Sequence, residues 1–129
     1  MNDAKHYAEN FGGSKGYYET RLGTEWTSSE PLAVRLLRRI LPVGNPGYEG
    51  KLHELGRWWV EFLDDLPWRE IGLGGNGELI VAGPNERDYG FWLDTNMTLA
   101  DFRDQDPTLT EIAAAEFEEA WTLFFSPAA

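Results

Sequence analysis

The sequence predicts an α+β fold: an antiparallel meander of about four strands with an N-terminal and a C-terminal helix packed on one face. Helical periodicity is confined to one segment before and one segment after a central region of period-two alternation. Within that central region, turns rich in glycine, proline and asparagine separate short apolar runs. Because 129 residues with 42% hydrophobic content can bury one core, we expect residues 1–129 to form a single domain.

The N-terminal third divides into an irregular part and a helix. Residues 1–26 mix glycines with aromatic residues without a sustained helical period. We expect them to be irregular and mobile at the start, with one short strand near residues 17–22. Ser-Ser-Glu-Pro at residues 28–31 is typical of a helix start, because a serine hydroxyl accepts from a free backbone N–H. Apolar residues at three- and four-residue spacing follow as far as Pro42, which predicts the N-terminal helix between these points.

The central region has the alternation of strands. Trp58, Val60 and Phe62 are expected on one face of the first strand, and Trp59 and Glu61 on the other. Large apolar groups on both faces require a strand that is covered on both sides or that exposes a tryptophan. Asn-Gly between the second and third strands is the strongest short hairpin signal. We expect strands over residues 58–63, 68–73, 78–82 and 89–94.

The last third is predicted to be helical. Thr98 and Asp101 have the spacing of a capping box, which favours a short helical turn. Thr108 and Glu111 repeat that spacing before a longer run of apolar residues with helical period. We therefore expect the C-terminal helix to begin at Thr108 and to end at Pro127.

Acidic side chains are concentrated in the second half of the chain. Residues 1–57 hold eight Lys or Arg and seven Asp or Glu, a charge of +1, whereas residues 58–129 hold three and fifteen, a charge of -12. A field of this sign repels nucleic acid, so we expect no nucleic-acid partner. No apolar run has the length of a signal peptide or membrane helix, and we expect a soluble, cytoplasmic protein without a membrane partner. The asymmetry favours a basic protein partner.

Motifs that would indicate a cofactor, a metal or a catalytic set are weak. Gly72, Gly74 and Gly77 satisfy G-x-G-x-x-G, but strand-forming residues follow them where a nucleotide site needs a helix. The two histidines, His6 and His53, belong to no metal-ligand spacing, and the chain has no cysteine. We therefore expect no cofactor, no metal site and no catalytic residues.

The acidic residues on or beside the predicted sheet are the candidate binding residues. Trp59 and Trp92 are expected opposite the core face, where they would be anchors in the interface. The predicted partner-binding residues are Trp59, Glu61, Asp64, Asp65, Glu70, Glu78, Glu86, Asp88, Trp92 and Asp94. In composition and rough architecture the chain is similar to small acidic immunity proteins, which occlude basic toxins such as nucleases. This similarity implies a non-enzymatic inhibitor.

Two other functions are consistent with the same residues. A small-ligand-binding domain would use the aromatic residues to line a concavity on the sheet. A glycosidase-like enzyme would place two of the carboxylates at a fixed separation, with one pKa raised by burial. Homodimerisation through the second apolar sheet face is compatible with all three functions.

Overall fold

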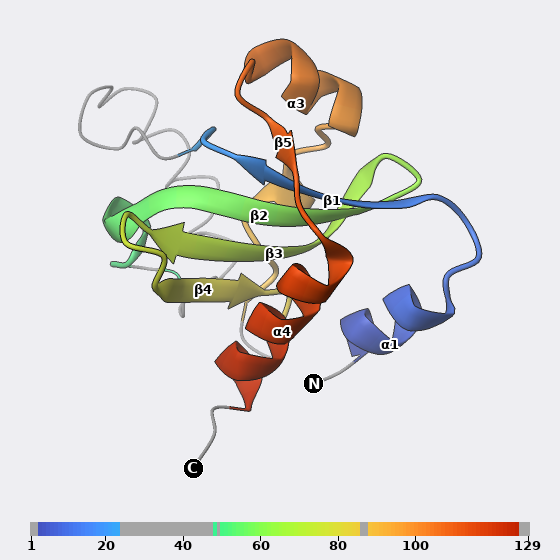
Figure 1. The fold of residues 1–129 in the computed structure, drawn as a ribbon, viewed down its shortest axis with the longest axis horizontal. Coiled ribbons are helices and arrows are strands. Elements are labelled where there is room, and N and C mark those ends of the chain that lie inside the picture. The colour runs from blue at the N-terminus through green and yellow to red at the C-terminus, as the bar shows by residue number, and fades with distance from the viewer. Residues whose placement is uncertain (1–2, 24–47, 49, 86–87, 127–129) are drawn as a thin grey trace.

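The computed structural model of the chain describes residues 3–23, 48, 50–85 and 88–126 (Figure 1). Its five strands form one antiparallel sheet in the order β4-β3-β2-β1-β5, and the helices at both ends of the chain contact that sheet. The elements are α1 (Asp3–Asn10), β1 (Lys15–Thr20), η2 (Leu52–Glu54), β2 (Leu55–Leu63), β3 (Leu66–Gly74), β4 (Leu79–Gly83), η3 (Trp92–Asp94), α3 (Leu99–Gln105), β5 (Thr110–Glu111) and α4 (Ala114–Phe125). The predicted α+β class and the antiparallel meander are confirmed.

Two tight turns set the register of the three central strands. Asp64 and Asp65 connect β2 to β3 with φ of 48° and 70°, the positive values that a two-residue type I′ turn requires. The turn from β3 to β4 closes with a hydrogen bond from the Gly74 N–H to the Glu78 carbonyl, 2.8 Å long. Gly77 has a φ of 89° there, which glycine adopts without strain. The hairpin predicted from Asn-Gly is confirmed.

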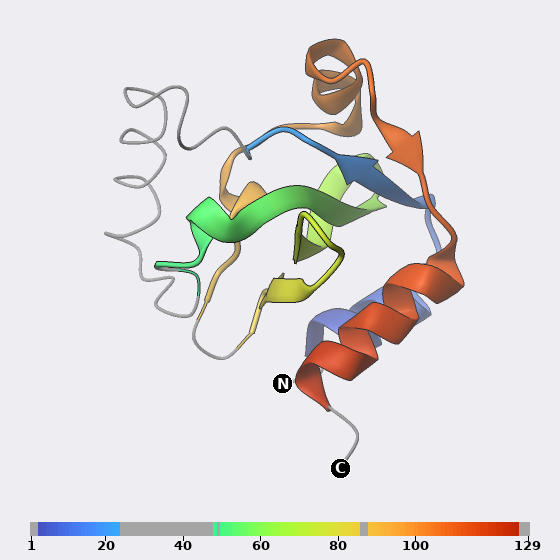
Figure 2. The ribbon, with the colours of Figure 1, turned by 60° about the vertical axis from the view of Figure 1, so that its left-hand side comes forward.

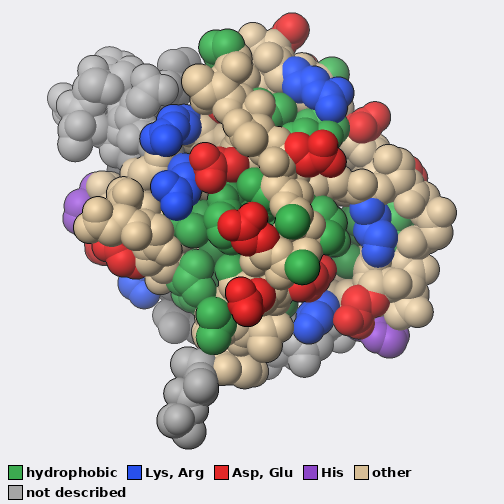
Figure 3. Space-filling model, in the orientation of Figure 1, with side chains coloured by type: hydrophobic (Ala, Val, Ile, Leu, Met, Phe, Trp, Pro, Cys, Tyr) green, Lys and Arg blue, Asp and Glu red, His purple; other side chains and the backbone are tan. Residues whose placement is uncertain are grey.

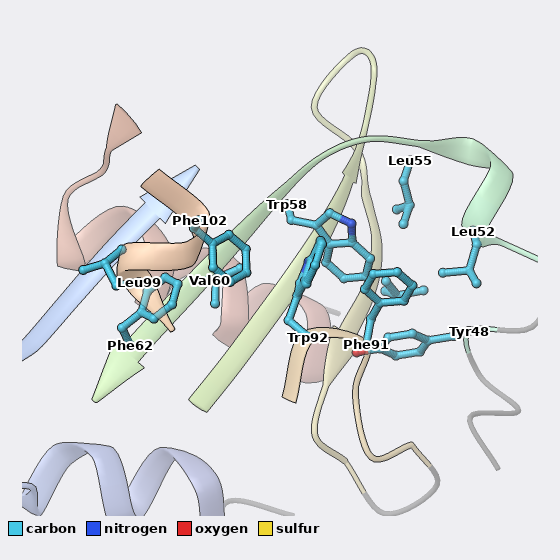
Figure 4. Close-up of a cluster of buried hydrophobic side chains, with 11 residues drawn as sticks. Tyr48, Leu52, Leu55, Trp58, Val60, Phe62, Phe91, Trp92, Leu99 and Phe102 are labelled. Atoms are coloured by element: carbon cyan, nitrogen blue, oxygen red, sulfur yellow. The ribbon is translucent and has the colours of Figure 1, made fainter. Parts of the chain in front are cut away.

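Both faces of the sheet are buried. A first hydrophobic cluster contains Trp58, Val60 and Phe62 of β2 together with Phe102 of α3 (Figure 4). A second cluster lies on the other face, where Trp59 packs with residues of α4. Figure 2 shows α4 on one side of the strands. The period-two alternation of β2 therefore predicted the faces correctly, and both faces are covered.

The N-terminal residues are more regular than expected. Residues 3–10 form α1, because Ala8 is buried and the Trp68 indole N–H donates to the Ala4 carbonyl at 2.8 Å. The strand expected near residues 17–22 is confirmed as β1. The helix expected over residues 28–41 lies outside the described residues. Among the described residues, no helix has the length and hydropathy needed to cross a membrane.

The prediction of a strand over residues 89–94 is wrong. This segment contains η3 instead, and its backbone does not enter the sheet. The N–H groups of Phe91 and Trp92 both donate to the buried carboxylate of Glu70. Because these donors are used by a side chain, they do not form a ladder with β4. The fourth strand of the meander is β1.

The C-terminal helix begins later than expected. The capping box at Thr98 is confirmed, but the second one is not, and α4 starts at Ala114. The Thr108 hydroxyl donates to Asp106 at 2.5 Å, and the same carboxylate accepts from the Thr20 hydroxyl at 2.6 Å. Asp106 thus joins the connection after α3 to β1, and Thr110–Glu111 then pairs with β1 as β5.

Candidate functional site

The two tryptophans expected as exposed anchors belong to the core. Trp59 has an exposed fraction of 9% and Trp92 one of 5%, and they lie in different clusters on opposite faces of the sheet. The Trp59 indole N–H donates to Glu19 at 3.0 Å. The expectation that both rings share a face opposite the core is wrong, because the sheet has a hydrophobic layer on each side.

The predicted acidic residues do not form one surface. Glu61, Glu70 and Asp88 are buried. Asp64, Asp65 and Glu78 are exposed, but they lie in turns at opposite ends of β3, roughly 26 Å apart at about 3.3 Å per residue. The remaining two, Glu86 and the side chain of Asp94, lie outside the part of the chain that the structure describes.

A row of polar side chains crosses the sheet beneath α4. Tyr17, Glu61 and Arg69 stand opposite one another in β1, β2 and β3. The Arg69 guanidinium donates to both oxygens of Glu61, at 2.6 and 2.9 Å. Its other N–H groups donate to Glu118 of α4, with one contact of 3.1 Å and a second from Nη2. We call Arg69, Glu61 and Glu118 the buried ion cluster.

Aromatic rings enclose the buried ion cluster. The Arg69 guanidinium lies 5.0 Å from the ring centroid of Phe117 and 4.9 Å from that of Trp121, within the range of cation–π attraction. Burial favours the uncharged guanidine, but the hydrogen bonds to Glu61 and Glu118 outweigh it and raise the pKa of Arg69. Burial, followed by the charge of Glu61, raises the pKa of Tyr17. Arg69 thus remains charged, and it fixes α4 to the sheet by ion pairs as well as by apolar contact.

A second buried carboxylate holds the segment after β4 on the opposite face. Glu70 accepts from the Tyr48 hydroxyl at 2.9 Å, from the Trp92 N–H at 2.7 Å and from the Phe91 N–H. The backbone of Gly90, with a φ of 109°, lies close to this carboxylate. A Cβ at Gly90 would lie 3.4 Å from the Glu70 carboxyl carbon. Burial raises the pKa of Glu70 to about 7, although these three hydrogen bonds favour the ionised form.

Three exposed carboxylates lie close together in sequence on the β5–α4 segment. Glu111, Glu116 and Glu119 are exposed, and none of the three forms an ion pair with a described residue. Glu116 and Glu119 are three residues apart on one side of α4, and Leu123, with an exposed fraction of 49%, follows four residues later. We call these three residues the outer face of α4. In Figure 3, acidic and hydrophobic side chains alternate over this side of the molecule.

The two buried carboxylates are not arranged as a pair around a substrate. Glu61 and Glu70 lie on opposite faces of the sheet, because Glu61 stands opposite Arg69 and Glu70 stands opposite Val60. Both are fully buried with their oxygens bonded to protein donors, so they do not flank a substrate. Within the described residues, no group of three or more His, Cys, Asp or Glu side chains could hold a metal ion.

Comparison with known proteins identified no relative of this chain. The chain matches no protein-family model, no curated protein and no solved structure.

Sequence reasoning missed the residues that organise the two buried carboxylates. Arg69 occupies a position between Pro67 and Ile71 where the alternation of β3 calls for an inward-facing apolar residue. A single arginine in that place is a signal of a buried ion pair, because a buried charge needs partners. Tyr48 and Glu118 carry no comparable signal, since a tyrosine in a loop and a glutamate on a helix are ordinary at exposed positions.

Replacing Arg69 by Met should destabilise the protein by about 3–5 kcal/mol, because Glu61 would remain buried without its cation. The triple variant with Arg69→Met, Glu61→Leu and Glu118→Met should recover much of that loss, since no buried charge remains. Urea denaturation of both variants measures the difference. Equal stability of Arg69→Met and the parent protein would contradict the role of the buried ion cluster.

The pH dependence of stability should depend on Glu70. Its pKa is raised from 4.5 to about 7 in the folded protein, so the folded state keeps a proton that the unfolded chain has released. The free energy of unfolding should therefore fall as the pH rises from about 5 to about 7, by at most about 1.4 kcal/mol per pH unit. Above about pH 7 this contribution should level off, because both states are then ionised.

The matched variant is Glu70→Gln, which keeps the shape of the side chain but carries no titrating proton. Its free energy of unfolding should show a flatter dependence on pH over the same interval, whatever its absolute stability. The same slope in the variant and the parent protein would show that Glu70 does not titrate there.

Proposed function

We propose that the protein is a non-enzymatic interaction module that binds a basic protein partner, in the manner of an immunity-type inhibitor. The observation that carries this proposal is the set of exposed, unpaired carboxylates on β5 and the outer face of α4, namely Glu111, Glu116 and Glu119. No Lys or Arg follows Arg103 in the sequence, so no basic residue of this segment neutralises them.

The position of α4 supports this use of its outer face. The buried ion cluster and the second hydrophobic cluster hold the inner side of α4 against the sheet. A partner would therefore meet carboxylates on a fixed helix, and less conformational entropy would be lost on binding. Complementary charge of this kind increases the rate and the selectivity of association more than it sets affinity.

The outer face of α4 also provides an apolar contact. Leu123 lies on the same side of the helix as Glu119, so a basic surface with a small apolar depression would bury Leu123 between the charge contacts. In this proposal Leu123 takes the role of anchor that the sequence assigned to Trp59 and Trp92.

The test compares two double variants that remove equal charge. Glu116→Gln with Glu119→Gln alters the outer face of α4, whereas Glu54→Gln with Asp104→Asn removes two exposed carboxylates on η2 and α3. Each protein, immobilised, is exposed to a lysate of the source cells at about 0.15 M and about 0.5 M salt, where exposed charges are strongly screened. The retained basic protein is then purified for titration.

We expect the parent protein and the η2/α3 variant to retain the same basic protein in stoichiometric amount at the lower salt concentration. The Kd of the Glu116/Glu119 variant should be at least about tenfold higher, a loss of about 1.4 kcal/mol. If both variants weakened binding equally, net charge alone would explain the effect, and the outer face of α4 would not be the binding site. No retained protein at either salt concentration would mean that the carboxylates serve solubility alone.

A further inference from the structure

A pocket of about 270 Å³ lies between α1 and α4, which Figures 1 and 2 both place side by side. Its lining residues are Lys5, His6, Glu9, Trp121, Thr122, Phe125 and Ser126. Lys5 and Glu9 on α1, and Trp121 and Phe125 on α4, are each four residues apart, the spacing that brings side chains to one side of a helix. None of them belongs to the outer face of α4, so the pocket is a separate feature.

The floor of the pocket is aromatic and contains an unused hydrogen-bond donor. The ring centroids of Trp121 and Phe125 are 4.6 Å apart. Trp121 has an exposed fraction of 1%, and its indole N–H is buried without an acceptor among the described residues. A buried donor without an acceptor is unfavourable, but protein atoms enclose this N–H, so its NMR signal is a local probe beside the pocket and not a ligand contact. The indoles of Trp58 and Trp92 also lack acceptors, but they lie within the first hydrophobic cluster.

The rim carries one positive and one negative charge. Lys5 and Glu9 lie one helical turn apart on α1, yet they form no ion pair with each other or with another described residue. Thr122 and Ser126 add hydroxyl groups from α4. The pocket therefore combines the aromatic ring of Phe125 with a cation, an anion, the imidazole of His6 and neutral hydrogen-bonding groups.

We propose that this pocket binds a small zwitterion with an aromatic side chain, the chemistry of a free aromatic amino acid. The ligand carboxylate pairs with Lys5 and its ammonium group with Glu9, while its ring contacts Phe125, which packs on the buried Trp121. A net anion would be repelled by the charge of -11, and a net cation would leave Lys5 without a partner. The pocket is slightly below the usual range of roughly 300–1,000 Å³, which restricts the ligand to a small molecule.

The test is an NMR titration of the full, ¹⁵N-labelled chain with L-phenylalanine as the probe. The Trp121 indole N–H signal is assigned with Trp121→Phe, or by sequential assignment if that variant does not fold. We expect a saturable shift of this signal with half-saturation on the order of 1 mM, ordinary for a ligand of this size. Benzoate and benzylamine, which each carry one of the two charges, should bind at least fivefold more weakly.

Two lysine variants complete the test. Lys5→Met should raise the half-saturation concentration of phenylalanine at least fivefold, whereas Lys51→Met, which removes an exposed lysine outside the pocket, should leave it unchanged. The proposal is overturned if phenylalanine causes no saturable shift, if benzoate or benzylamine binds as well as phenylalanine, or if Lys5→Met binds like the parent protein.

Discussion

The rest of the structure depends on the charge of Arg69 in the centre of the sheet. A guanidinium buried at this position requires carboxylates, and it takes one from the neighbouring strand, Glu61, and one from α4, Glu118. The first contact pairs β2 with β3 in the register that their tight turn sets, and the second fixes the position of α4. Removing Arg69 would leave Glu61 buried without its cation, so the ion cluster specifies this arrangement against alternatives that shift the helix.

On the opposite face of the sheet, a single buried carboxylate holds the covering segment in place. Within the described residues, Glu70 accepts no hydrogen bond from a cation and instead receives the Tyr48 hydroxyl and two backbone N–H groups. These donors hold the segment around Phe91 and Trp92 over the first hydrophobic cluster, which covers that face. The buried carboxylates of the two faces therefore have different roles. Glu61 pairs with Arg69, which in turn binds α4, whereas Glu70 binds the irregular segment around Phe91 directly.

The sequence predicted the parts of the fold that depend on local patterns. Alternation identified both faces of β2, Asn-Gly located the β3–β4 hairpin, and Thr98 with Asp101 located the start of α3. The prediction failed where a side chain hydrogen-bonds to the segment in question. Glu70 accepts the N–H groups of Phe91 and Trp92, which a strand would have used in the sheet. Asp106 accepts the Thr108 hydroxyl, which therefore does not cap a helix. Charge counts alone could not separate buried acids such as Glu61 from exposed ones such as Glu116, because burial follows from pairing across the sheet. For that reason the predicted site residues were scattered.

The most direct test of the role of Arg69 is amide hydrogen exchange, measured by NMR on the parent protein and on Glu118→Gln, which keeps the Arg69–Glu61 pair and removes only the ion pair to α4. If the buried ion cluster attaches α4 to the sheet, the substitution should lower the protection of α4 amides such as those of Trp121 and Thr122 far more than that of β2 and β3 amides such as those of Val60 and Ile71. Unchanged protection in α4, or an equal loss in α4 and in the central strands, would contradict this role.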